Sequence, residues 1–166
     1  MANEKIGDPA VYACLEHLGI KYGYTEHPPA PTIEIARKYW KGCARHCKNL
    51  FFRNHKGNRH YLAVFDGEKD LDIRRLELLL KQGKLSFASE RRMWKYLRVQ
   101  PGSVSPFCLL NDEENHVHMF LDKNLSTASY LAFHPNDNRA TVEISGEDFL
   151  KVLEVLGNTY EWTELY

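Results

Sequence analysis

Apolar residues recur every three or four positions in five stretches of the chain, a spacing that gathers them on one face of a helix. Helices are therefore predicted over 9–18, 33–39, 70–82, 90–97 and 146–156. In other stretches apolar and polar residues alternate, or short apolar runs lie between turn residues, as strands do. These stretches predict strands over 20–27, 49–54, 60–65, 85–88, 107–111, 117–121, 128–133 and 140–144. The tail, 158–166, favours neither structure.

Residues at the predicted helix ends support this assignment. Asp8 can cap the first helix and Pro9 suits its first position. Ser89 can cap the helix over 90–97, and Ser145 the last one. These four residues fix where three of the predicted helices begin.

Strands and helices do not alternate strictly, which indicates a mixed α/β (α+β) domain with about seven strands and flanking helices. The acidic turn 112–115 predicts a hairpin between the strands on either side of it. No glycine-rich phosphate loop follows a strand, and this excludes a doubly wound nucleotide-binding fold. No repeat or linker divides the chain, so one domain over 1–166 is expected.

Charge restricts the ways in which the protein could bind nucleic acid. The 22 basic and 22 acidic side chains cancel to a net charge of zero. A protein that grips RNA along its backbone is strongly basic, so any RNA contact here must be local. The polar start, the short apolar runs and four cysteines without a framework spacing predict a cytoplasmic protein with reduced thiols and no membrane contact.

Two of three loops with candidate chemistry lie in the first two-thirds of the chain. In 47–54, Lys48 and Asn49 stand at the mouth of an apolar strand, where both can face a pocket. In 100–107, Gly102 allows the backbone to approach a ligand, and successive N–H groups of a tight turn can bind a carbonyl oxygen or oxyanion.

The third loop is 133–141, where His134 ends a strand and can exchange a proton near neutral pH. Each signal also has an ordinary explanation. Lys48 can be a solvated lysine, Gly102 can serve a simple turn, and His134 can lie on the surface. Taken singly, the three loops are weak evidence.

Together and in this order, the three loops match a family. They contain the motifs Lys48-Asn49-Leu50-Phe51, Gly102-Ser103-Val104-Ser105-Pro106-Phe107, and Phe133-His134-Pro135-Asn136 with Ala140-Thr141-Val142. The sequence resembles the prolyl-tRNA-synthetase-associated editing domains over about residues 8–156. Within them it is most similar to the stand-alone alanyl-tRNA(Pro) deacylases.

The resemblance implies a mixed sheet curled into a partly barrel-like core. It also implies trans-editing, the hydrolysis of the ester of a mischarged tRNA(Pro), with alanyl-tRNA(Pro) as substrate and prolyl-tRNA synthetase as a possible partner. Neither a cofactor nor a metal is implied. The implied catalytic residues are Lys48, Asn49, Gly102, Ser103 and His134. The implied substrate-binding residues are Leu50, Phe52, Val104, Phe107 and Asn136.

The expected mechanism uses no protein nucleophile, because the sequence contains neither a serine or cysteine nucleophile elbow nor a zinc-hydrolase signature. By resemblance, a ribose hydroxyl of the tRNA assists the attacking water. The protein would then position the ester and stabilise the oxyanion. The alternatives are deacylation of a tRNA mischarged with cysteine or serine, and a non-catalytic module that binds tRNA or a synthetase.

Two surfaces and two cysteines complete the expectations. The helix over 90–97 and the residue after it present a basic face that could contact the tRNA, formed by Arg91, Arg92, Lys95 and Arg98. A second candidate tRNA contact is Arg37, Lys38 and Lys41. Cys47 could be a reactive thiol or a small space-filling residue, and Cys108 stands where the family pattern suggests glycine. Cys43, His46 and Cys47 could also bind a metal, although the spacing lacks its second half.

Overall fold

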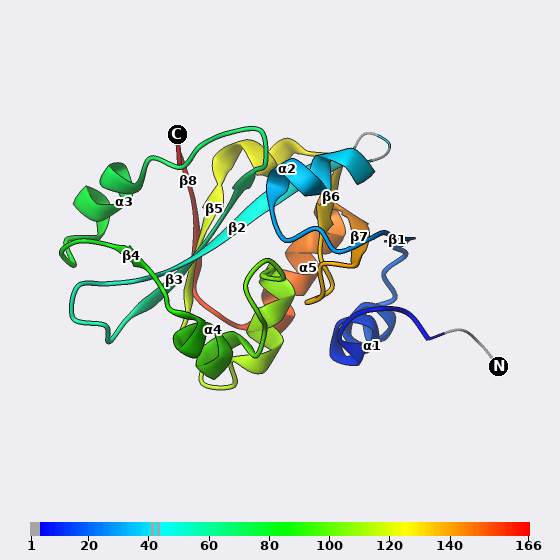
Figure 1. Cartoon of the computed structure of the whole chain (residues 1–166), viewed down its shortest axis with the longest axis horizontal. Helices are drawn as coiled ribbons and strands as arrows, with labels where there is room; N and C mark the ends of the chain where they lie inside the picture. The colour runs from blue at the N-terminus through cyan, green and yellow to red at the C-terminus, as the bar shows by residue number, and fades with distance from the viewer. Residues whose placement is uncertain (1–3, 41, 43) are drawn as a thin grey trace.

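The computed structural model describes residues 4–40, 42 and 44–166, so Lys41 and Cys43 lie outside the described residues. Within them, eight strands form one sheet in the order β1-β7-β6-β2-β3-β5-β8, and β4 pairs with β2 off this path (Figure 1). The strands are β1 (Gly23–Glu26), β2 (Arg45–Arg53), β3 (His60–Asp66), β4 (Ser86–Phe87), β5 (His118–Asp122), β6 (Tyr130–Phe133), β7 (Ala140–Ser145) and β8 (Tyr160–Thr163). The α-helices are α1 (Pro9–His17), α2 (Ile33–Ala36), α3 (Ile73–Leu80), α4 (Glu90–Leu97) and α5 (Gly146–Leu156).

The sheet is mixed and curled, but it is not closed. The pairs β2–β6, β3–β5 and β5–β8 are parallel, and the remaining pairs are antiparallel. The predicted α+β class with flanking helices is confirmed, and β1 and β8 remain as separate edges of the sheet.

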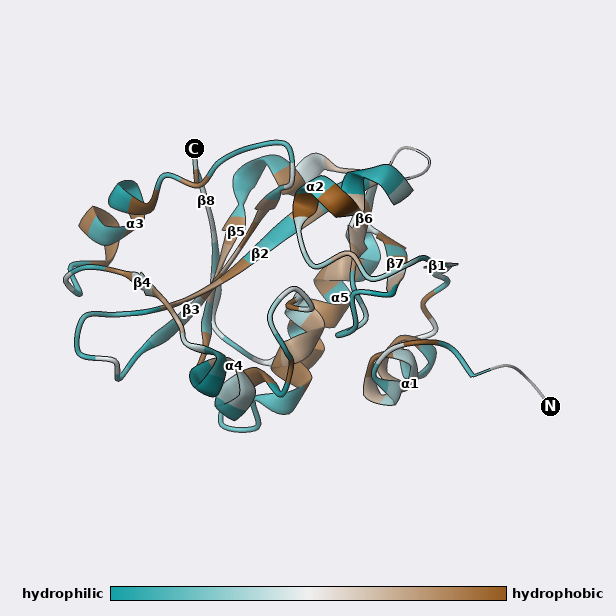
Figure 2. Ribbon diagram, viewed as in Figure 1, coloured by the Kyte–Doolittle hydropathy of each residue, from teal (hydrophilic) through white to brown (hydrophobic). Residues whose placement is uncertain are grey.

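Both faces of the sheet bury apolar side chains. The larger core packs α1 and α5 against one face, where Leu15 of α1 and Phe149 of α5 are almost fully buried. A smaller core lies under α3, with Leu76 against Phe65. Figure 2 shows the result: α5 is largely tan to brown, whereas the turn between β2 and β3 is teal. No helix in the described part of the chain is long and apolar enough to cross a membrane.

The predicted hairpin around the acidic turn is wrong. Pro106–Asn111 forms a 3-10 helix, and β5 pairs in parallel with β3 and β8 instead. The capping residue explains the helix, since the Ser105 hydroxyl accepts a hydrogen bond from the Phe107 N–H at 3.1 Å. Pro106 suits the first helical position because it has no N–H to donate. The ambiguous tail supplies the partner strand, β8.

One edge of β2 is covered at its two ends only. β6 pairs with Arg45 and His46, and β4 pairs with Phe52 and Arg53. Between them, 47–51 has no neighbouring strand on this side, although the Ala88 N–H donates to the Phe51 carbonyl. The sheet therefore has a gap in the middle of β2, and the candidate site lies there.

Hydrogen-bonded polar side chains surround the buried His60 at the start of β3. The Arg92 guanidinium lies 3.1 Å from His60 Nε2, so this nitrogen accepts, and Nδ1 lies 2.8 Å from His116 Nε2. Burial, then the charges of His116 and Arg92, lower the pKa of His60 to about 4. The folded protein therefore keeps His60 neutral at a pH where the unfolded chain binds a proton.

We expect this histidine to make the fold sensitive to acid. Because the pKa of His60 is lower in the folded protein, its contribution to stability is fully present above pH 6.5. That contribution is lost as the pH falls from about 6.5 to about 4. One such group changes the free energy of unfolding by at most about 1.4 kcal/mol per pH unit. Urea unfolding at several pH values should give a smaller slope for His60→Gln, which keeps an acceptor for Arg92. Equal slopes for both proteins would contradict this assignment.

Candidate active site

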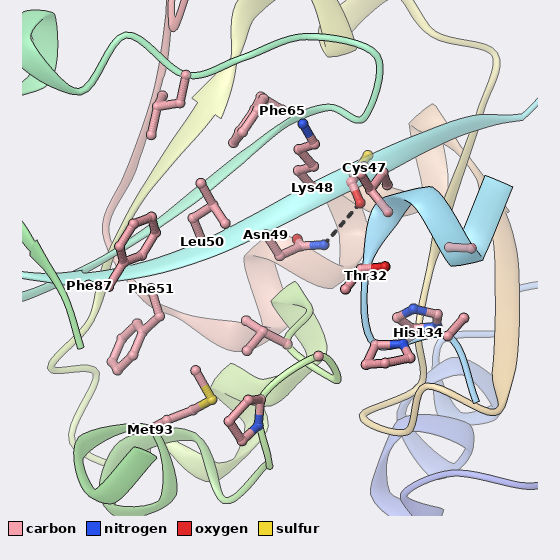
Figure 3. Close-up of a pocket in the computed structure, with 18 of the residues that line it drawn as sticks. Thr32, Cys47, Lys48, Asn49, Leu50, Phe51, Phe65, Phe87, Met93 and His134 are labelled. Carbon is pink, nitrogen blue, oxygen red and sulfur yellow. Dashed lines mark hydrogen bonds between the residues drawn. The ribbon is translucent and has the colours of Figure 1, made fainter. Parts of the chain in front are cut away.

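A cavity of about 600 Å³ opens at the gap in β2. Such a volume is usual for sites that bind small molecules. Its walls come from the start of α2, from β2, from β4 and the beginning of α4, and from the turn before Val104 (Figure 3). Polar side chains line a mostly apolar space, and they include Thr32, Lys48, Asn49 and His134.

Lys48 lies at the rim of the cavity. Its ammonium donates to the Lys69 carbonyl at 3.1 Å and lies 3.5 Å from the fully exposed Asp70 carboxylate. Figure 3 shows the side chain pointing toward Phe65, on the other side of β2 from Asn49. The lysine side chain is 22% exposed, so its charge lies close to the cavity and is not paired with a buried carboxylate.

Asn49 presents both its side chain and its backbone to the gap. Its Nδ2 donates to the Cys47 carbonyl at 3.4 Å, and its Oδ1 is buried without a partner among the described residues. The His46 carbonyl accepts from Gly67 on the β3 side, whereas the Phe51 carbonyl faces Ala88. Backbone groups of a strand alternate in direction, so the Asn49 N–H points into the gap.

Gly102 brings two cavity walls into contact. Its φ is +87°, and a Cβ added there would lie 2.8 Å from Pro31 Cα and 2.9 Å from Pro31 O. Only glycine allows this approach without displacing the backbone. Pro31 precedes Thr32, whose hydroxyl caps α2, so the contact with Gly102 holds the loop next to the start of α2.

His134 lines the cavity as a neutral ring. Its Nδ1 lies 2.8 Å from the Ala140 carbonyl and must carry the proton of that hydrogen bond. Burial is the main cause that lowers the pKa of His134 below its usual value. Its Nε2 is therefore free to accept a hydrogen bond near neutral pH.

Four predicted site residues do not line the cavity: Phe52 and Phe107, which lie in the core, and Ser103 and Asn136, which hold loops together. Phe52 belongs to the smaller core and stacks on Phe87 at 4.8 Å, and Phe107 lies edge-on to Phe133 in the larger core. Both were expected as pocket walls. The walls are instead Leu50 and Val104, which were predicted, together with Phe51 and Met93, which were not.

Ser103 and Asn136 make hydrogen bonds that connect the loops. The Ser103 N–H donates to Gln100 O at 3.2 Å, so it is not available to bind a carbonyl oxygen as expected. Asn136 adopts a φ of +62°, and its Oδ1 accepts from Ser105 and Cys108, both at 3.1 Å. These contacts join the loop of Gly102 to the loop of His134.

The gap in β2 explains why Phe51 was not predicted as a lining residue. Lys48 and Leu50 lie on one face of β2 and Asn49 and Phe51 on the other, so alternation suggests that only one pair can line a site. At an uncovered edge both faces reach the same space. The gap could not be predicted from the sequence, because it depends on how far β4 and β6 extend along β2.

The two unusual cysteines are not activated thiols. Burial raises the pKa of Cys47, which lines the cavity, and raises the pKa of Cys108 to about 12. Thiolates attack, and thiols with a raised pKa do not. The described residues contain no group of three potential metal ligands, and the metal alternative relied on Cys43, which lies outside them.

Helix α4 has one side toward the cavity and another toward solvent. Glu90 and Met93 line the cavity, while Arg91, Lys95 and Arg98 are exposed. Arg92 differs from the prediction, because it turns inward and donates to the Gly57 carbonyl at 2.8 Å as well as to His60. The solvent-exposed basic face thus consists of three residues.

Comparison with known proteins identifies the family. A family model for the aminoacyl-tRNA editing domain matches residues 27–152. The prolyl-tRNA editing protein ProX of Acetoanaerobium sticklandii is 46% identical over 157 residues, which cover 94% of this chain and 96% of the relative. The mouse prolyl-tRNA synthetase associated domain-containing protein 1 is 31% identical over 148 residues, 85% of this chain and 86% of that protein.

One solved structure shows the same fold. It is described as a "putative trans-editing enzyme for prolyl tRNA synthetase", and it has a TM-score of 0.68 at 19% identity, over 96% of this chain and 99% of the other. The family model and the relatives cover most of the sequence, including all three loops. The chain belongs to the aminoacyl-tRNA editing domain family.

Proposed function

We propose that this protein removes alanine from mischarged tRNA(Pro) by hydrolysing the ester at the 3′ end of the tRNA. The observation that carries the proposal is the cavity at the gap in β2, where Lys48, Asn49, Gly102 and His134 surround one space. Membership of the editing family and 46% identity to a prolyl-tRNA editing protein support both the reaction and the tRNA. We expect the protein to act in the cytoplasm, with prolyl-tRNA synthetase as a candidate partner.

Each side chain has a part in positioning the ester. We assign the Lys48 ammonium to the anionic terminal nucleotide, which it can reach from the rim. The Asn49 N–H replaces that of Ser103 as the donor to the carbonyl oxygen, because it faces the gap. His134 Nε2 accepts from a ribose hydroxyl, since its Nδ1 is held by Ala140. A donor placed where negative charge develops lowers the barrier.

The attacking group is water. Its oxygen bonds to the ester carbonyl carbon, and the bond from that carbon to the 3′ oxygen breaks. One proton of the water moves to the 3′ oxygen, which leaves as a hydroxyl. The neighbouring 2′ hydroxyl orients the water, since neither Cys47 nor Cys108 supplies a thiolate. A tRNA that ends in 2′-deoxyadenosine should therefore react on the order of 100-fold more slowly.

Size explains the choice of alanine. A synthetase pocket that holds proline cannot strongly reject a smaller side chain, because a missing methylene changes binding by about 1–3 kcal/mol. A second pocket that excludes proline supplies the discrimination. Leu50, Phe51, Met93 and Val104 are the apolar walls available for it.

A panel of charged tRNAs tests the proposal. The pure protein is incubated with alanyl-, cysteinyl-, seryl- and prolyl-tRNA(Pro), and release of the amino acid is followed. Fast loss of alanine with prolyl-tRNA spared is the expected result. Faster loss of cysteine or serine would assign a different substrate, and loss of none would indicate a binding module.

The exposed basic face of α4 should contact tRNA phosphates. Replacing Arg91 and Lys95 together with alanine should raise KM about fivefold at low salt and leave kcat unchanged. It should also reduce the slope of log KM against log salt by about 1 to 2. The matched control replaces Lys123 and Lys151, two exposed lysines away from the cavity lining. An unchanged salt slope for the α4 variant would place the tRNA elsewhere.

A further inference from the structure

A second, much smaller cavity lies beside the main one. Its volume is about 30 Å³, close to that of a single water molecule. It shares Ile33, Ala36, Cys47, Asn49 and His134 with the large cavity. Its remaining lining residues are His27, Trp40, His46, Ala132, Phe133 and Thr141. The two spaces therefore adjoin at the five shared residues.

Two of the lining residues carry buried polar atoms without a partner among the described residues. These atoms are His46 Nε2 and Asn49 Oδ1. An unpaired polar atom in a protein interior is costly, and such atoms are nearly always bonded to protein or to ordered water. Their neighbours restrict both groups. The His46 ring stacks on Trp40 at 4.3 Å and 13°, and Asn49 Nδ2 is held by Cys47.

The other imidazoles determine which donors and acceptors face the small cavity. His27 has its Nδ1 on the Pro28 carbonyl and its Nε2 on the Thr141 hydroxyl, so both nitrogens are used. His134 has only Nε2 left, as an acceptor. With the proton on Nε2, His46 is the donor. One water can accept from His46 Nε2 and donate to Asn49 Oδ1.

We propose that the small cavity binds one ordered water, and that through this water His46 acts as a positioning residue for Asn49. The positioning role rests on the proposed deacylase function, whereas the water site does not. The water holds the oxygen end of the Asn49 amide while Cys47 holds the nitrogen end. Burial, then His134 and His27, lowers the pKa of His46 to about 4, so the ring stays neutral at pH 7.

Crystallography tests the water site without any substrate. A structure of the wild-type protein that resolves ordered solvent should show one isolated peak within about 3.2 Å of both His46 Nε2 and Asn49 Oδ1. A dry cavity, or a direct hydrogen bond between the two atoms, overturns the proposal. This result does not depend on whether the protein deacylates any tRNA.

Kinetics tests the positioning role. His46→Phe keeps a ring against Trp40 but removes the donor, and it should lower kcat about tenfold with KM changed less than about twofold. His46→Gln, which returns an amide donor, should recover at least about a third of the wild-type kcat. His55→Phe, at an exposed histidine, is the matched control and should behave as the wild type.

An unchanged kcat in His46→Phe, or no recovery in His46→Gln, would overturn the positioning role even if the water is seen. Circular dichroism and melting temperature confirm that each variant is folded before it is assayed. If the wild-type protein itself releases no amino acid, the proposed function fails. The crystallographic peak then still decides whether the water site exists.

Discussion

Lys48→Ala is expected to lower the rate of alanine release by about 100- to 1,000-fold, the usual loss when a preorganised charge or donor is removed from a reacting centre. The ammonium lies at the rim of the cavity, held by the Lys69 carbonyl and the exposed Asp70. Those contacts are weak enough to release it toward a bound nucleotide. Single-turnover assays with alanyl-tRNA(Pro) measure the effect.

The fold should survive this substitution. An exposed ion pair such as Lys48 with Asp70 contributes about 1 kcal/mol or less, so the melting temperature should change by a few degrees at most. Lys69→Ala is the matched control, because it removes a neighbouring positive charge from a side chain that does not line the cavity. A Lys48→Ala variant as active as Lys69→Ala would refute the assignment of Lys48.

Gly102→Ala is the second variant with a large expected effect. The new methyl group would lie 2.8 Å from Pro31 Cα and 2.9 Å from Pro31 O. The alanine would also have to adopt a φ of +87°, which side chains other than glycine disfavour. The backbone before α2 has to move, and a displacement of about 1 Å at a reacting site can cost 100-fold in rate. We therefore expect activity to fall by about that factor, with a lower melting temperature.

Gly19→Ala separates the backbone strain of a positive φ from the steric contact with Pro31. Gly19 also has a positive φ, +68°, but a Cβ there meets no atom within 4 Å. It should lose about 1 kcal/mol of stability from backbone strain and retain full activity. If Gly102→Ala were as active as Gly19→Ala, the close approach to Pro31 would have no role in the site.

Local signals in the sequence were sufficient for α4 and α5. Ser89 caps α4, which begins at Glu90 and ends at Leu97 as predicted, and Ser145 caps α5. In both, the serine hydroxyl accepts from a backbone N–H three residues on. Caps and a 3.6-residue period are contained within about a dozen residues, so no distant contact is needed to recognise them.

Pairing between distant strands could not be predicted in the same way. The run after Pro106 is as apolar as a strand, and a short apolar run does not distinguish a strand from a buried 3-10 helix. Only the parallel pairing of β5 with β3 and β8 excludes the hairpin. That pairing joins residues about 40 or more positions apart in the chain, for example Met119 with Tyr160.

The same limit explains the site. Lys48, Asn49, Gly102 and His134 stood out because each is a polar or permissive residue beside an apolar strand, and all four lie on the cavity wall. The apolar walls were harder to choose. Phe52 faces the core under α3, and its neighbour Phe51 lines the cavity, because successive side chains of a strand point to opposite faces.

The most direct measurement is the single-turnover rate at which purified protein in excess releases alanine from alanyl-tRNA(Pro), beside prolyl-tRNA(Pro) under the same conditions. The account predicts release of alanine at least about 100 times faster than the spontaneous hydrolysis of the ester, with prolyl-tRNA(Pro) left at its spontaneous rate. Alanine loss at the same rate with and without the protein, or equal loss of proline, would contradict it.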